Sequence, residues 1–159
     1  MEDSLNQASA MAQMGTCSPL IRRLIEEYGF PLLGAGELDA FLRQEPETVT
    51  VLFFPEDAKK YPESNDVAVV LPELVEHFGG RLRAAVISRQ DEKALQQLYG
   101  FQQWPALVFV RGQTYLGSIC KIQDWEVYLE RIEKILQSES GQPRGIGIPV
   151  VTDAARDQA

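Results

Sequence analysis

The feature that most constrains the fold of this 159-residue chain is an almost unbroken apolar run, Thr48-Val-Thr-Val-Leu-Phe-Phe54. Its residues are β-branched or aromatic, as is typical of strands. A strand with one face in water alternates apolar and polar residues, so a continuous run indicates a strand that is covered on both faces. We therefore expect this strand at the centre of a sheet with helices on both sides.

The segments around this run alternate between helical and strand-like patterns. Helices between strands imply right-handed parallel crossovers, whereas a final hairpin around Gly112 adds an antiparallel part. The predicted fold class is therefore α/β, with a mixed sheet flanked by helices. The expected elements are a helix within 18–29, an edge strand at 30–33, a helix at 36–44, the central strand at 48–54, a helix ending at Phe78, a strand at 81–87, a helix at 91–99, strands at 106–110 and 114–119, and a helix at 123–137.

Individual residues predict the start, the shape and the end of the helix that stops at Phe78. Asn65 or Asp66 is expected to cap its start, because both side chains can accept a hydrogen bond from the first free backbone N–H groups. Pro72 is expected to kink it, because proline removes one backbone hydrogen bond and its ring is bulky. Gly79-Gly80 follows as the stop signal.

Composition divides the chain into three parts. We expect a flexible N-terminus at 1–17, one domain at 18–137 and a flexible tail at 138–159, because both ends are rich in polar residues and lack periodicity. The tail nevertheless contains an apolar segment, 146–151, which could dock on the domain or on a partner.

The charge balance and the shortage of histidine and cysteine exclude several functions. A formal net charge of -8 disfavours nucleic acid and anionic lipid as partners and favours a basic one. His77, Cys17 and Cys120 show no metal-ligand spacing and no nucleophile pattern, so we expect neither a metal nor a cofactor. No apolar run approaches the roughly 20 residues of a membrane helix. The start of the chain has no signal-peptide pattern, which predicts a cytoplasmic protein without membrane insertion.

The segment Tyr99-Gly-Phe-Gln-Gln-Trp-Pro-Ala-Leu107 resembles the element of thioredoxins that carries a cis-proline. Pro105 would be that proline, the sequence Phe109-Val-Arg-Gly112 resembles the hairpin that follows, and Pro72 resembles the proline of the family's second helix. The resemblance covers residues 30 to 137 and implies a thioredoxin-like fold. It also implies that backbone groups near Pro105 can pair with an extended peptide.

The same resemblance shows that the redox chemistry is missing. Where thioredoxins carry Cys-x-x-Cys, this chain has Ser64-Asn65-Asp66-Val67, and Leu52 stands where the family places a buried acid. Thiol exchange requires a thiolate that attacks a sulfur. The chain is therefore not expected to be an enzyme of this kind.

A narrower resemblance is to the hydrogenase expression/formation proteins of the HyaE, HupG and HoxO type. It rests on the Cys-less turn, the helix before the first strand, the loop through Pro62-Glu-Ser-Asn-Asp66 and the sequence Phe101-Gln-Gln-Trp-Pro-Ala-Leu-Val-Phe109. It implies a non-catalytic cytoplasmic chaperone for an uptake [NiFe]-hydrogenase. Its partners would be the small-subunit precursor with its twin-arginine signal peptide and other hydrogenase accessory proteins.

A receptor for such a peptide needs carboxylates beside an apolar surface, because arginine binds carboxylates through paired hydrogen bonds. One alternative is that the acidic side chains are simply solvated, since Lys59 and Lys60 dilute their charge. Two other functions are open for the chain: an interaction module of another complex, or a thiol redox protein that uses Cys120 or Cys17. The predicted peptide-binding residues are Glu56, Asp57, Glu63, Asp66, Glu73, Trp104 and Pro105.

Overall fold

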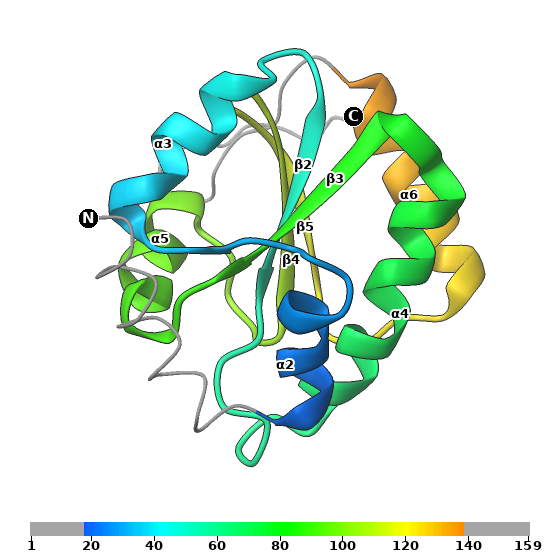
Figure 1. Cartoon of the computed structure of the whole chain (residues 1–159). Coiled ribbons are helices and arrows are strands. Elements are labelled where there is room, and N and C mark those ends of the chain that lie inside the picture. The colour runs from blue at the N-terminus through cyan, green and yellow to red at the C-terminus, as the bar shows by residue number, and fades with distance from the viewer. Residues whose placement is uncertain (1–17, 139–159) are drawn as a thin grey trace.

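The computed structural model describes residues 18–138, which form one five-stranded sheet between two layers of helices (Figure 1). The strands lie in the order β1-β3-β2-β4-β5, so the apolar run at 48–54 forms the central strand, as predicted. The elements are α2 (Pro19–Glu26), β1 (Leu32–Leu33), α3 (Ala35–Gln44), β2 (Val49–Phe54), α4 (Glu63–Phe78), β3 (Leu82–Ile87), α5 (Glu92–Tyr99), β4 (Ala106–Arg111), β5 (Thr114–Cys120) and α6 (Trp125–Gln137), with short 3-10 turns at Gly79–Arg81 and Arg89–Asp91.

The sheet is mixed, as the order of helices and strands predicted. Strand β3 pairs in parallel with β1 and β2, whereas β4 runs antiparallel to both β2 and β5. The two-residue strand β1 is an edge, which suits the proline just before it. Figure 1 shows α4 and α6 on one face of the sheet and α3 and α5 on the other.

Alternation along β2 explains why both faces are covered. All six residues of β2 are buried. Val51 and Phe53 pack with α2, α4 and α6, while Leu52 and Phe54 pack with α3 and α5. Because successive side chains of a strand point to opposite faces, one apolar strand contributes to two hydrophobic cores.

The start of α4 differs from the prediction. The helix begins at Glu63, and Pro62 occupies the cap position without a side-chain cap. Asn65 and Asp66 were therefore wrong as caps, because the N–H of Asn65 is already bonded to the carbonyl of Pro62 at 3.1 Å, one turn earlier. The hydroxyl of Ser64 instead donates to the carbonyl of Pro55, which ties the helix start to the end of β2.

Two further expectations concern Pro72 and the start of the last helix. Pro72 lies inside α4 and is buried, and α6 begins at Trp125, two residues later than predicted. The predicted flexible N-terminus at 1–17 and, beyond Ser138, the predicted flexible tail at 138–159 lie outside the described residues. Within residues 18–138, no helix has the length and apolar character needed to cross a membrane.

Candidate functional site

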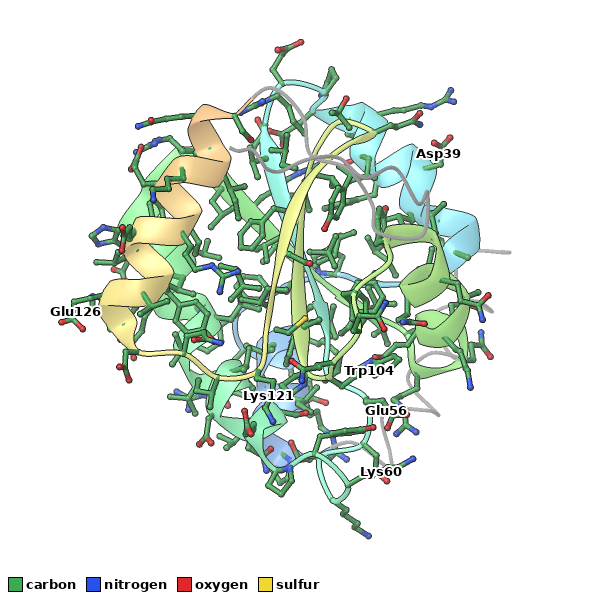
Figure 2. The ribbon with its side chains drawn as sticks, turned by 180° about the vertical axis from the view of Figure 1, so that it is seen from behind. Asp39, Glu56, Lys60, Trp104, Lys121 and Glu126 are labelled. Carbon is green, nitrogen blue, oxygen red and sulfur yellow. The ribbon has the colours of Figure 1, made fainter. Side chains whose placement is uncertain are left out.

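The peptide bond between Trp104 and Pro105 is cis, as the sequence predicted. It lies just before β4, and the N–H of Lys121 donates to the carbonyl of Pro105 at 2.6 Å. Phe54, the last residue of β2, pairs with Ala106, the first of β4. The loop after β2, the Trp104–Pro105 bond and the loop after β5 therefore meet at one end of the sheet. Figure 2 shows Glu56, Lys60, Trp104 and Lys121 together at this end.

A buried carboxyl group, that of Glu92, organises one side of this end. Glu92 is 2% exposed, and its Oε1 accepts hydrogen bonds from the N–H of Glu56 and from Nε1 of Trp104, both at 3.0 Å. Burial raises the pKa of Glu92 to about 8, against the lowering effect of these hydrogen bonds and of nearby Arg89. Near neutral pH the group is therefore largely protonated, and a protonated carboxyl group keeps lone pairs that can still accept both hydrogen bonds.

The loop after β2, which is hydrogen-bonded to Glu92, carries two of the predicted acidic residues, Glu56 and Asp57. Glu56 has a left-handed backbone (φ 54°), which is uncommon for residues other than glycine. Its carboxylate lies 3.8 Å from Arg89 and accepts the N–H of Asp57. Asp57 accepts the N–H of Lys59, so the loop is shaped largely by its own acidic side chains.

On the other side of Pro105, Glu63 joins the start of α4 to the loop after β5. Its carboxylate accepts the N–H of Ile122 at 2.9 Å and lies 3.3 Å from the ammonium group of Lys121. The hydrogen bond from Ile122, followed by the interaction with Lys121, lowers the pKa of Glu63. Lys121 also has a left-handed backbone (φ 64°), so two strained residues flank the cis-proline.

The last two predicted acidic residues lie in different places. Asp66 is exposed in the first turn of α4, and no side chain within residues 18–138 pairs with its carboxylate. Glu73 is ten residues beyond Glu63 on the same helix, about 15 Å along its axis. It lines a hollow of about 140 Å³ between α2 and α4, beside Arg23 and Tyr28. The structure thus brings Glu56, Asp57 and Glu63 to the end of the sheet that carries Trp104 and Pro105. Asp66 follows Glu63 in the first turn of α4, and Glu73 lies farther along that helix.

Sequence reasoning missed Glu92, and also Tyr61, whose ring lies 6.3 Å from that of Trp104. Glu92 is in the first turn of α5, where an acidic residue is normally solvated and favoured by the helix dipole. The one signal in the sequence was the indole of Trp104, because a partly buried indole N–H needs an acceptor.

The described residues contain no group of histidine, cysteine and carboxylate side chains that could hold a metal ion. Cys120 is a half-buried free thiol at the end of β5, opposite Ala106, and it packs against the core under α3 and α5. Cys17 lies outside the described residues. The site is therefore a polar and aromatic surface around a cis-proline.

The mixed sheet, its two helical layers and the cis-proline before β4 define a thioredoxin-like α/β protein. Thioredoxin from Plasmodium falciparum has the same fold, with a TM-score of 0.54 at 10% sequence identity, over 65% of this chain and 97% of that one. At this identity, the likeness concerns the fold alone.

Sequence comparison gives the family. Residues 20–128 match the model of the family described as "Hydrogenase-1 expression protein HyaE", and the chain belongs to this family. The hydrogenase expression/formation protein HoxO of Azotobacter vinelandii is 48% identical over 135 residues, which cover 84% of this chain and 87% of HoxO. HupG of Bradyrhizobium diazoefficiens is 43% identical over 129 residues, with coverages of 80% and 87%. This membership supports a role in hydrogenase maturation.

Proposed function

We propose that this chain is a non-catalytic, cytoplasmic chaperone that binds the small-subunit precursor of an uptake [NiFe]-hydrogenase and its twin-arginine signal peptide before export. Family membership supports the hydrogenase part of the proposal. The peptide part rests on the surface around the cis-proline, and other hydrogenase accessory proteins are proposed as further partners.

The single observation that carries the proposal is the meeting of carboxylates, aromatic rings and strained backbone at the Trp104–Pro105 bond. Glu92 fixes the indole of Trp104 and the backbone of Glu56 in one hydrogen-bonded unit. Tyr61 places a second ring beside that indole. A surface that combines aromatic rings with acidic groups is complementary to a peptide that is basic at its start and apolar afterwards.

The carboxylates of this surface differ in whether a neighbouring cation already lies beside them. Glu63 is already engaged by Lys121 and Ile122, and Glu56 lies close to Arg89. The exposed carboxylate of Asp66 has no such cation among residues 18–138, and Asp57 accepts only a backbone N–H there. We therefore propose that Asp66 and Asp57 pair with the two arginines, and that Glu73 contributes little.

Titration calorimetry with the signal peptide of the hydrogenase small subunit tests the proposal, with a twin-lysine peptide as the matched control. The expected result is micromolar binding that weakens with salt and prefers arginine, because only guanidinium pairs with a carboxylate through two parallel hydrogen bonds. Equal affinity for the two peptides, or no heat with either, would contradict the proposal.

A further inference from the structure

A groove of about 360 Å³ lies between α3 and α5, on the opposite face of the sheet from α4 and α6. Its lining is mainly apolar and includes Leu38, Leu42, Leu95, Leu98, Tyr99 and Tyr115. Leu98 is 61% exposed, more than any other large hydrophobic side chain in residues 18–138. The two helices therefore leave this apolar groove open between them, and the groove is not part of the surface around the cis-proline.

The described chain ends at the tip of the β4–β5 hairpin, and this tip borders the groove. Arg111 donates hydrogen bonds to the carbonyls of Leu136 and Ser138, at 2.7 and 2.8 Å, and so fixes the end of α6 to the tip of the β4–β5 hairpin. Two residues further along that tip, Gln113 lines the groove and donates to Asp39 on α3. Figure 2 shows Asp39 at the opposite end of the molecule from Trp104, the same end at which α6 terminates.

The sequence beyond this point supplies a segment that fits. Residues 139–145 form a spacer of seven residues, which can reach up to about 25 Å. The segment Ile146-Gly-Ile-Pro-Val-Val151 follows. In an extended backbone, Ile146, Ile148 and Val150 share one side, so that three β-branched side chains face the same way.

We infer that segment 146–151 docks in the groove between α3 and α5 of its own chain. The groove supplies apolar walls and an open mouth, and the short spacer starts at the hairpin tip that borders it. Tethering raises the local concentration of the segment, so that modest apolar contacts suffice for binding. The inference is independent of the proposed function, because it involves neither Trp104 nor any of the acidic residues near it.

Paired cysteines in the full chain test this docking. In a background with Cys17→Ser and Cys120→Ser, Leu98→Cys is combined with Ile148→Cys. The matched control combines Val69→Cys with Ile148→Cys, because Val69 is 48% exposed on α4, on the other face of the sheet. A glutathione redox buffer then measures the effective concentration of each thiol pair.

The expected result is an effective concentration at least about tenfold higher for the Leu98 pair than for the Val69 pair, with the disulfide formed within one chain. Equal values for the two pairs would overturn the inference. Disulfide-linked dimers as the main product would also overturn it, because the segment would then bind a second copy.

Hydrogen exchange gives a second readout that needs no disulfide. Ile148→Asp places a charge in the segment, so amide exchange in α3 and α5 is expected to become severalfold faster. Thr152→Asp, just after the apolar segment, is the matched control and should leave that exchange unchanged. Unchanged exchange with Ile148→Asp would overturn the inference.

Discussion

Two glutamates on either side of the cis-proline show how differently the same side chain behaves in one small region. Glu92 is buried between the loop after β2 and the indole of Trp104, and desolvation raises its pKa to about 8. Glu63 lies at the surface, and the N–H of Ile122 and the charge of Lys121 lower its pKa. The charge of this surface therefore depends on the environment of each carboxyl group and cannot be obtained by counting acidic residues.

The largest expected effect comes from removing the buried carboxyl group. Glu92→Ala leaves the N–H of Glu56 and Nε1 of Trp104 without an acceptor, so the free energy of unfolding should fall by about 2–4 kcal/mol. Glu92→Gln is the matched control, because its carbonyl can still accept both bonds, and it should cost clearly less. Urea unfolding at neutral pH measures both; equal losses would mean that these hydrogen bonds are unimportant.

The second prediction concerns pH. The pKa of Glu92 is about 8 in the folded chain, against an ordinary value of 4.5 for a glutamate, so the folded state holds the proton more tightly. The resulting stability is complete below about pH 4.5 and is lost as the pH rises through about 8, with a slope of at most about 1.4 kcal/mol per unit. Urea unfolding across this range should show that slope in the natural chain, and Glu92→Gln should remove it.

Glu63 should show the opposite pH dependence and a smaller effect. Its lowered pKa contributes stability above the ordinary glutamate pKa of 4.5, and that stability is lost as the pH falls through the lower pKa of the folded state. Glu63→Gln keeps an acceptor for Ile122 but loses the partly exposed pair with Lys121, so unfolding at pH 7 should change by less than about 1 kcal/mol. A change as large as that of Glu92→Ala would remove the distinction between the two glutamates.

The smallest effect is expected from the thiols. Cys17→Ser combined with Cys120→Ser should leave binding of the signal peptide unchanged, because the proposed function uses no thiol. Hydrogenase maturation in cells carrying this double variant is the corresponding physiological readout. Loss of maturation with a stable fold would favour a thiol redox protein instead.

The fold was predictable from sequence because its signals are local. The apolar run at 48–54 identified β2, and Gly100 and Gly112 marked the end of α5 and the hairpin turn. The resemblance of the segment around Pro105 to thioredoxins predicted the cis bond. Asn65 and Asp66 misled as caps because the helix already begins at Glu63, with Pro62 at the cap position, and proline has no side-chain group that could cap it.

The candidate site was only partly predictable, because tertiary contacts decide the state of its carboxyl groups. Nothing near Glu92 in the sequence indicates burial, which depends on the loop after β2 and on Trp104, 12 residues away. Glu73 was grouped with Glu63 by sequence proximity, although it faces α2. The ion pairs of Glu63 with Lys121 and of Glu56 with Arg89 likewise depend on the folded structure and cannot be read from the sequence.

The proposed pairing of Asp66 with an arginine of the signal peptide is tested by comparing Asp66→Lys with Glu126→Lys, with binding of the twin-arginine peptide as the readout. Both residues are exposed and acidic in the first turn of a helix, so both reversals should destabilise the fold by a similar small amount, under about 1 kcal/mol. Figure 2 shows Glu126 on α6, well away from Trp104. The account predicts about tenfold weaker binding for Asp66→Lys and less than about twofold for Glu126→Lys. Equal binding by the two variants would contradict it.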